Sequence, residues 1–271
     1  MENILVAVVQ MVSGTDVENN IAIMTKLVRQ AARNGAQWVV LPEYWPIMGQ
    51  KDTDKIRYAE PLGQGKLQAV MAELAAELNI VLFGGTIPLQ SQYDNKVLNS
   101  MLVYGTQGQL IGQYDKMHLF GYSGLGEQYS EENTIEAGQK IPELIIDNIS
   151  VAQGICYDLR FPEFFRAQLP FKVLVLPAAF TFTTGKAHWQ TLLKARAIEN
   201  QCFVLAAAQG GVHQNKRRTF GHSMIINPWG EIIASLAEGE GVVTASLNGT
   251  VLSSIRKNLP ALKHQILSCK N

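Results

Sequence analysis

The segment Val151-Ala152-Gln153-Gly154-Ile155-Cys156-Tyr157-Asp158-Leu159-Arg160-Phe161-Pro162-Glu163 determines how the rest of the chain is interpreted. It begins as a short apolar strand, reaches a cysteine and continues through polar residues into a helix that starts near Pro162. This order places the Cys156 thiol at the carboxyl end of a strand, where open α/β sheets bind their ligands. A thiol in this position is either an enzyme nucleophile or a packed small side chain, because free cysteine is among the most buried residue types.

The segment belongs to a regular alternation of strands and helices. Hydrophobic periodicity and stop signals predict strands at 150–155, 173–177 and 203–208, with helices at 162–168 and 187–200. The first half shows the same order, with strands at 5–10, 38–43 and 80–84 and helices at 16–34 and 66–78. A hairpin follows in each half, at 97–114 and 223–233, and Val39-Val40-Leu41-Pro42 is echoed by Leu174-Val175-Leu176-Pro177. These repeats predict an internal duplication.

Two such halves can bury their apolar faces by stacking one mixed sheet on the other with the helices outside. The predicted α/β fold is therefore a four-layer α-β-β-α sandwich. Two separate three-layer domains are the alternative, although no linker rich in Pro, Gly or Ser separates the halves near residues 138–148. We expect a single domain over residues 1–258, including a further strand at 242–247. The tail at 259–271 is expected to pack on the body or on a partner subunit.

Composition excludes several classes of function. The 271 residues are 47% hydrophobic and carry 23 basic and 23 acidic side chains, so no net charge attracts nucleic acid or an anionic membrane. Cys156, Cys202 and Cys269 show none of the paired spacings of zinc sites or disulfide frameworks. The chain enters an apolar strand at once and contains no run of about 18 apolar residues. We therefore expect a soluble cytoplasmic protein without a bound metal.

Two polar residues of the first half accompany the cysteine. Glu43 closes the second predicted strand and Lys116 closes the first hairpin, so both are expected near Cys156 at the carboxyl ends of the strands. A carboxylate can take the proton of a thiol, the thiolate can attack a carbonyl carbon, and an ammonium can stabilise the oxyanion that develops. Taken singly, Glu43 also fits a surface strand end, and Lys116 also fits a solvated turn.

Three motifs in this order resemble the nitrilase, or carbon-nitrogen hydrolase, superfamily. They are Leu41-Pro42-Glu43, Tyr114-Asp115-Lys116-Met117-His118-Leu119-Phe120 and Gly154-Ile155-Cys156-Tyr157-Asp158-Leu159-Arg160-Phe161-Pro162-Glu163. The resemblance implies the same sandwich, dimerised or assembled further, with Glu43 as general base, Lys116 as transition-state stabiliser and Cys156 as nucleophile. It also implies a second glutamate before Gly138, which is Glu131 when counted from that glycine and Glu132 when counted from Lys116.

The resemblance further implies a reaction without a metal or an organic cofactor. The thiolate attacks a primary amide, Lys116 and the backbone N–H of Tyr157 hold the oxyanion, ammonia leaves, and water activated by Glu43 hydrolyses the thioester. Arg160 is the candidate for binding a carboxylate of a small substrate, and an ion pair with Glu163 or Asp158 is its alternative role. Phe180 and Thr181 are expected to line the pocket.

The second half is most similar to the branch of deaminated glutathione amidases. The ω-amidase branch, which acts on α-ketoglutaramate and α-ketosuccinamate, is the alternative. His188, His222 and Cys202 are interpreted as structural. A catalytically silent scaffold protein that keeps the sandwich and a thiol-dependent acyltransferase are the alternatives from other classes.

Overall fold

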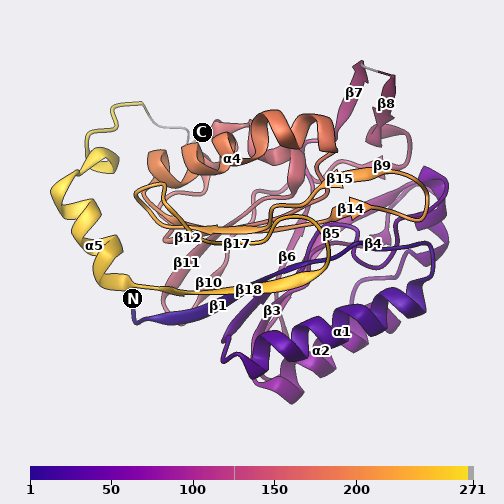
Figure 1. The fold of residues 1–271 in the computed structure, drawn as a ribbon, viewed down its shortest axis with the longest axis horizontal. Helices are drawn as coiled ribbons and strands as arrows, with labels where there is room; N and C mark the ends of the chain where they lie inside the picture. Colours follow the sequence, from indigo (N-terminus) through magenta and orange to yellow (C-terminus); the bar gives the residue numbers. More distant parts are fainter. Residues whose placement is uncertain (125, 268–271) are drawn as a thin grey trace.

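Two mixed β-sheets lie face to face in the computed structural model, which describes residues 1–124 and 126–267, and helices cover their outer sides (Figure 1). The elements before residue 140 are β1 (Ile4–Gln10), α1 (Val17–Arg33), β2 (Trp38–Val40), the 3₁₀ helix η1 (Asp52–Tyr58), α2 (Lys66–Leu78), β3 (Val81–Phe83), β4 (Ile87–Gln90), β5 (Val97–Tyr104), β6 (Leu110–Asp115), β7 (Gly121–Gly124), β8 (Glu127–Ser130), η2 (Glu131–Asn133) and β9 (Ile135–Glu136).

The second half repeats this alternation. Its elements are β10 (Ile145–Ile146), β11 (Ile149–Gln153), η3 (Cys156–Arg160), α3 (Pro162–Ala167), β12 (Val173–Ala178), α4 (Phe182–Asn200), β13 (Phe203–Ala208), β14 (Gly210–Val212), β15 (Arg218–Phe220), β16 (Met224–Ile226), β17 (Ile232–Ser235), β18 (Gly241–Leu247), α5 (Gly249–Asn258) and η4 (Ala261–Lys263). The predicted strands and helices are present in the predicted order.

The two sheets share a common arrangement. The first has the order β18-β1-β2-β3-β5-β4, with β6 and β9 also paired to β5, and the second has the order β10-β11-β12-β13-β16-β17. In each sheet three parallel strands, β1-β2-β3 or β11-β12-β13, are followed by an antiparallel one. An internal duplication predicts this correspondence.

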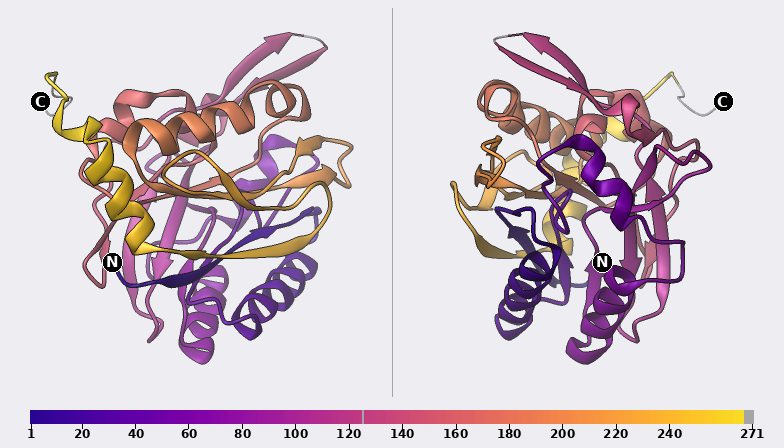
Figure 2. Two further views of the ribbon diagram at one scale, coloured as in Figure 1. Left: turned by 60° about the vertical axis from the view of Figure 1, so that its left-hand side comes forward. Right: turned by 90° about the vertical axis from the view of Figure 1, so that its right-hand side faces the viewer.

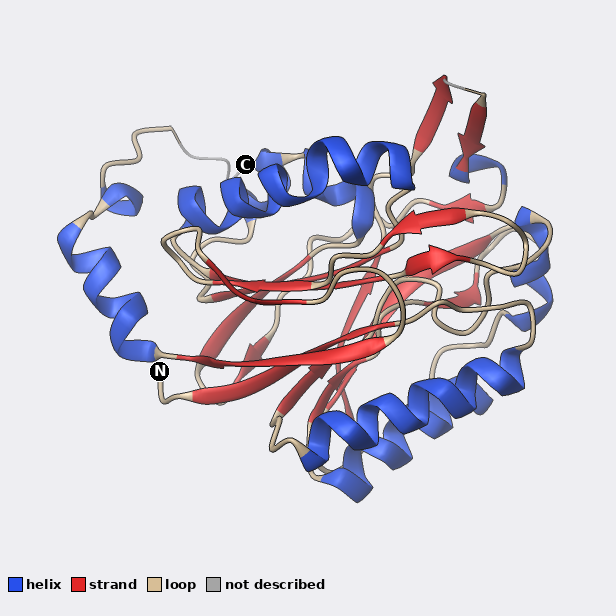
Figure 3. Cartoon of the chain, in the orientation of Figure 1, coloured by secondary structure: helices blue, strands red, loops and turns tan. Residues whose placement is uncertain are grey.

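Alternating side chains of the first sheet enter two different cores. Val6, Val8 and Val40 belong to the core shared with the second sheet. Their neighbours Ala7 and Val9 belong to the core formed with α1 and α2, because successive side chains of a strand point to opposite faces. Figure 3 shows α1 and α2 outside the first sheet and α4 outside the second. The four-layer sandwich predicted from the sequence is confirmed.

Two predicted details were wrong, and two hairpins were missed. The second strand ends at Val40, so Glu43 lies in a turn beyond the strand. α4 begins at Phe182, five residues before the predicted start, because Thr181 caps it by accepting a hydrogen bond from the Thr184 N–H. The hairpins β7–β8 and β14–β15 were not predicted, and β7–β8 extends away from the body (Figure 2).

The C-terminal segment packs on the body through α5. Leu252 is buried, and the Arg256 guanidinium donates hydrogen bonds to the carbonyl oxygens of Gln201 and Phe171. Beyond α5 the side chains of Ile266 and Leu267 are largely exposed. The last four residues of the predicted tail, with Cys269, lie outside the described residues. The division of the chain at residue 258 stays a prediction.

Candidate active site

Glu43 lies in the turn that follows β2, at the carboxyl end of a parallel strand. The turn is packed tightly against the loop after β3, where a side chain on Gly85 would place its Cβ 2.1 Å from the Pro42 carbonyl oxygen. Gly85 also has a positive φ of 58°, a conformation that favours glycine. The Thr86 hydroxyl accepts a hydrogen bond of 2.9 Å from the Tyr44 N–H and fixes the turn from the same loop. These contacts hold the Glu43 side chain fully buried.

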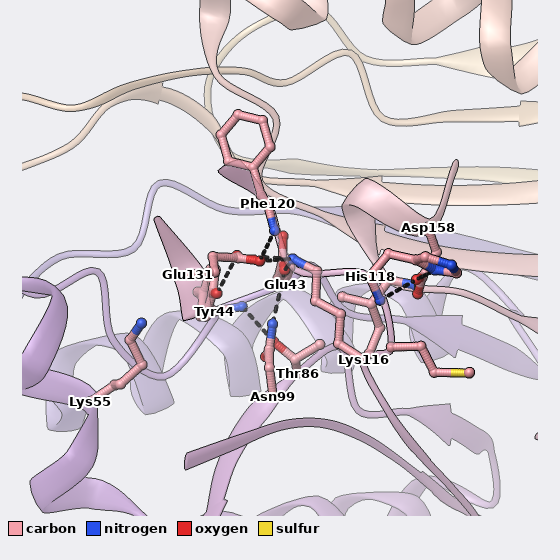
Figure 4. A network of polar contacts seen from close by, with 12 residues as sticks. Glu43, Tyr44, Lys55, Thr86, Asn99, Lys116, His118, Phe120, Glu131 and Asp158 are labelled. Carbon is pink, nitrogen blue, oxygen red and sulfur yellow. Dashed lines mark hydrogen bonds and ion pairs between the residues drawn. The ribbon is translucent and has the colours of Figure 1, made fainter. Parts of the chain in front are cut away.

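Lys116 follows β6 and points at Glu43. Its Nζ donates hydrogen bonds to Oε1 of Glu43 at 2.9 Å and to the two oxygens of Glu131 at 2.9 and 2.7 Å (Figure 4). Asn99 of β5 donates to the same Glu43 oxygen at 2.9 Å. A lysine with no exposed surface is tolerated here because two carboxylates surround it.

The second carboxylate of this cluster is Glu131. Besides Lys116, it accepts hydrogen bonds from the Tyr44 hydroxyl and the Phe120 N–H, both at 2.7 Å. The neighbouring Glu132 contacts only the Ser130 hydroxyl, at 3.3 Å, and lies towards solvent. Counting residues from Gly138 and from Lys116 left Glu131 and Glu132 as alternatives for the second glutamate. In the structure, Glu131 is the one that lies in the cluster.

Cys156 is the first residue of η3 and follows β11 after the short loop Gly154-Ile155. Its backbone is strained. Its φ of 50° lies in the left-handed region, which costs a residue with a Cβ roughly 1–2 kcal/mol. The buried Asp158 holds this turn, because its carboxylate accepts hydrogen bonds from the Ile155 N–H, the Tyr114 hydroxyl and the His118 N–H at 2.8, 2.7 and 3.1 Å. The residues of the lysine motif thus fix the geometry of the cysteine motif.

We predict that Asp158→Asn weakens both the fold and the site. The asparagine amide would turn an NH₂ group towards hydrogen-bond donors that the carboxylate now accepts from. Hydrogen bonds to a charged group contribute about 1.5–3 kcal/mol each, so their loss is costly. We expect the free energy of unfolding, measured with urea, to fall by about 3 kcal/mol. The exposed Asp94 offers the matched control, since Asp94→Asn should change stability by less than about 0.5 kcal/mol. A stability equal to that of the parent would contradict the positioning role of Asp158.

The protonation states follow from burial and from this cluster. Burial raises the pKa of Glu43, and the charge of Lys116 only partly opposes it. Burial also raises the pKa of Glu131, but the charge and hydrogen bonds of Lys116 outweigh this effect and leave its pKa below the ordinary value. Burial lowers the pKa of Lys116, yet the charges of Glu131 and Glu43 hold it well above normal. Lys116 and Glu131 therefore stay ionised at neutral pH, while Glu43 is the carboxylate that takes up a proton more readily.

The Cys156 thiol is a neighbour of Glu43 in this cluster. Burial and then the charge of Glu43 raise the pKa of the thiol well above its ordinary value. The interaction with the thiol in turn lowers the pKa of Glu43. Oε2 of Glu43 is buried and accepts no hydrogen bond in the described part of the chain. A protonated thiol and an acceptor oxygen with free capacity make proton transfer between them the available chemistry.

A small pocket of about 220 Å³, which we call the inner pocket, opens above the thiol. Cys156, Tyr157, Arg160, Phe180 and Thr181 line it, so all four predicted substrate-binding residues lie there. The Arg160 guanidinium lies over the rings of Tyr157 and Phe180 and 3.3 Å from Nδ1 of His188. It forms no ion pair with a carboxylate in residues 1–124 and 126–267, so neither Glu163 nor Asp158 neutralises it.

A larger cavity of about 780 Å³, which we call the outer cavity, adjoins the inner pocket. The two share Phe120, Ala179 and Thr181. Tyr44 and Glu131 line the outer cavity beside Lys55 of η1. Tyr44, Asn99 and Lys55 were not predicted from the sequence, and Asp158 was considered only as an ion-pair partner of Arg160. Of the three missed residues only Asn99 carried a visible signal, since it belongs to the polar pair Asn99-Ser100 within the mainly apolar strand β5.

The remaining predicted structural residues are not part of the acid cluster. Cys202 is fully buried, and its thiol donates to the Arg196 carbonyl oxygen. His222 stacks on Phe220. His188 lies inside α4 and not at its start, next to Arg160. The part of the chain that the structure describes contains no cluster of His, Cys, Asp and Glu suited to a metal ion. It likewise contains no helix long and apolar enough to span a membrane.

Comparison with known proteins agrees with the fold and identifies the family. Residues 5–257 match the carbon-nitrogen hydrolase family model. Deaminated glutathione amidase of Synechocystis sp. is 36% identical over 98% of this chain and 99% of its own, and that of Homo sapiens is 36% identical over 96% and 82%. The crystal structure of Saccharomyces cerevisiae Nit3, a member of branch 10 of the nitrilase superfamily, matches with a TM-score of 0.88 at 28% identity over 98% of this chain and 97% of that one. The chain belongs to the carbon-nitrogen hydrolase family.

Proposed function

We propose that the protein hydrolyses an amide bond of a small carboxylate-bearing substrate through a thioester on Cys156. The convergence of Glu43, Lys116 and Cys156 carries this proposal. Glu43 takes the thiol proton, the sulfur attacks the carbonyl carbon, and Lys116 with the backbone N–H of Tyr157 stabilises the oxyanion. Glu131 positions Lys116 and keeps it charged. The amine then leaves with the proton, and water activated by Glu43 hydrolyses the thioester.

Deaminated glutathione is the first substrate candidate, because the relatives that match over nearly the whole chain bear the name of its amidase. The guanidinium of Arg160 lines the inner pocket and forms no ion pair with a carboxylate that the structure describes, which supports an acyl group that carries a carboxylate. α-Ketoglutaramate, the substrate of an ω-amidase, offers the same group and stays the second candidate. The bond cleaved in α-ketoglutaramate is a primary amide and releases ammonia, as expected from the sequence. The bond cleaved in deaminated glutathione is a secondary amide, so its nitrogen leaves as cysteinylglycine and the expectation of a primary amide does not apply to it.

The assay that tests the proposal compares these two substrates with a simple aliphatic nitrile. Formation of α-ketoglutarate is the readout common to both amides. We expect kcat/KM to be highest for deaminated glutathione, lower for α-ketoglutaramate, and turnover of the nitrile to be undetectable. The reverse order of the two amides would favour an ω-amidase. Absence of turnover of either amide would support a silent scaffold instead.

We predict an acid limb in the pH profile of kcat/KM that belongs to Glu43. The base works only when deprotonated, so activity should rise with pH through a pKa above the ordinary value of 4.5. The charge of Glu131 contributes to this raised pKa. Glu131→Gln should therefore move the acid limb to lower pH, while Glu132→Gln leaves it in place. A limb that moves upward in Glu131→Gln would contradict the assigned electrostatics.

The cytoplasmic location, the assembly into a homodimer or higher homo-oligomer and the independence from cofactors also stay predictions. Size-exclusion chromatography with light scattering measures the assembly state directly.

A further inference from the structure

The inner pocket is too small to hold a whole tripeptide-like substrate. Its volume is about 220 Å³, whereas pockets for small organic ligands commonly enclose about 300–1,000 Å³. The outer cavity is larger than the inner pocket, opens to solvent and shares Phe120 and Thr181 with it. A substrate that reaches beyond the inner pocket therefore enters the outer cavity.

The outer cavity is basic. Its lining includes four basic side chains, Lys51, Lys55, Arg217 and Arg218, and two acidic ones, Asp52 and Glu131. Glu131 binds Lys116, Asp52 pairs with Arg217, and Arg218 pairs with Glu238, which leaves Lys51 and Lys55 as the lining cations without an ion pair among the described side chains. The cavity therefore offers a surplus of positive charge to an anion.

Lys55 is the more buried of the two lysines in this lining. Its side chain is half-buried, and its Nζ donates to the Thr134 hydroxyl at 3.0 Å and lies 5.4 Å from the centre of the Tyr44 ring. Among the side chains that the structure describes it forms no ion pair, although the charges of Glu131 and Asp52 favour its ammonium form. Burial lowers the pKa of Lys55, so the protein holds this ammonium at a cost that a bound anion would offset. Figure 4 shows Lys55 beyond Tyr44 and Glu131, on the opposite side of the cluster from Asp158.

Two cationic sites thus flank the thiol from different directions. Arg160 lies in the inner pocket with Cys156, and Lys55 and Arg217 lie in the outer cavity. We propose that the outer cavity binds the amine half of the substrate and that Lys55, assisted by Arg217, holds a carboxylate at the far end of that half. This inference rests on the proposed amidase function. It adds to that function the residues that bind the far end of the amine half.

The chemistry accommodates such a leaving group. The sulfur–carbon bond forms first and gives the oxyanion; the carbon–nitrogen bond then breaks, and the nitrogen leaves as a neutral amine with the proton that Glu43 took from the thiol. The distal carboxylate takes no part in these steps and contacts Lys55 before and during them. Removal of this carboxylate from the substrate should therefore mainly raise KM and weaken binding.

The test compares deaminated glutathione with its C-terminal amide, which differs only in the terminal carboxylate. We expect the parent protein to prefer the free acid in kcat/KM by about tenfold, the effect of one charge-assisted contact. Lys55→Met should reduce this preference to near one, Lys55→Arg should restore most of it, and the exposed Lys26→Met should keep it. A parent that does not discriminate, or a preference unchanged in Lys55→Met, would overturn the inference.

A binding measurement separates this inference from the proposed function. Isothermal titration of Cys156→Ala protein with the two compounds does not depend on turnover. We expect the free acid to bind about tenfold more tightly than the amide, and Lys55→Met in the same background to remove the difference. Equal affinities would refute the carboxylate site even if the protein is an amidase. Absence of turnover in the parent together with selective binding would instead refute the amidase while retaining the site.

Discussion

Replacing Cys156 by alanine is expected to lower turnover by at least about 10⁴-fold while leaving the protein folded. The thioester cannot form without the sulfur, and neither Glu43 nor Lys116 can replace it as nucleophile. Alanine also carries a Cβ, so the backbone strain at a φ of 50° is the same as with cysteine. We therefore expect the backbone of η3 to keep its conformation. The substitution removes only one buried sulfur atom, and we expect the free energy of unfolding to change by about 1 kcal/mol or less.

The control for this experiment is Cys202→Ala. Cys202 is also fully buried, and burial raises the pKa of its thiol, but it lies outside the acid cluster. We expect this variant to keep the parent turnover. Mass spectrometry of the parent, quenched during turnover, should detect the acyl group on Cys156 alone. A Cys156→Ala protein that still hydrolyses amide at close to the parent rate would disprove the role of the thiol.

Glu43→Gln is expected to lower kcat by about 10²–10⁴-fold, the range associated with general acid–base groups. The amide has the same shape as the carboxylate and can still accept hydrogen bonds from Asn99 and Lys116, but it cannot take the thiol proton. The fold should therefore persist, and the loss should appear in the chemical steps.

A second property of the Glu43→Gln variant distinguishes proton transfer from packing. The charge of Glu43 raises the pKa of the Cys156 thiol, so its removal should lower that pKa. The rate of alkylation of Cys156 by iodoacetamide should then reach its plateau at lower pH, although turnover falls. Glu132→Gln serves as the control, because the Glu132 side chain contacts only Ser130. A Glu43→Gln protein with near-parent turnover, or with an alkylation profile moved to higher pH, would exclude Glu43 as the base.

The convergence of Glu43, Lys116 and Cys156 could be predicted because each residue follows a strand whose neighbours are recognisable by apolar runs. Parallel strands bring their carboxyl ends to one edge of a sheet, which placed Glu43 after β2 and Cys156 after β11 at such edges. These two strands belong to different sheets and Lys116 follows β6, so the expectation that all three residues meet also needed the three motifs of the family resemblance.

Other parts of the site depend on chain paths that leave no periodic signal. Glu131 follows the unpredicted hairpin β7–β8, and counting residues through it could not separate Glu131 from Glu132. Lys55 lies on a 3₁₀ helix with no buried residues, which has no apolar stripe to reveal it. To predict the contact of Arg160 with His188, the start of α4 would have to be known. That start is set by the Thr181 cap and not by hydrophobic spacing.

The pairing of β18 with β1 has a consequence for biosynthesis. Seven consecutive residue pairs join Ile4–Gln10 to Gly241–Leu247, so β1 leaves the ribosome long before its partner strand is made. Until then one border of β1 offers free N–H and C=O groups to any other nascent chain. Slowing translation of the codons between β1 and β18 should therefore lengthen the period in which newly made chains need a chaperone.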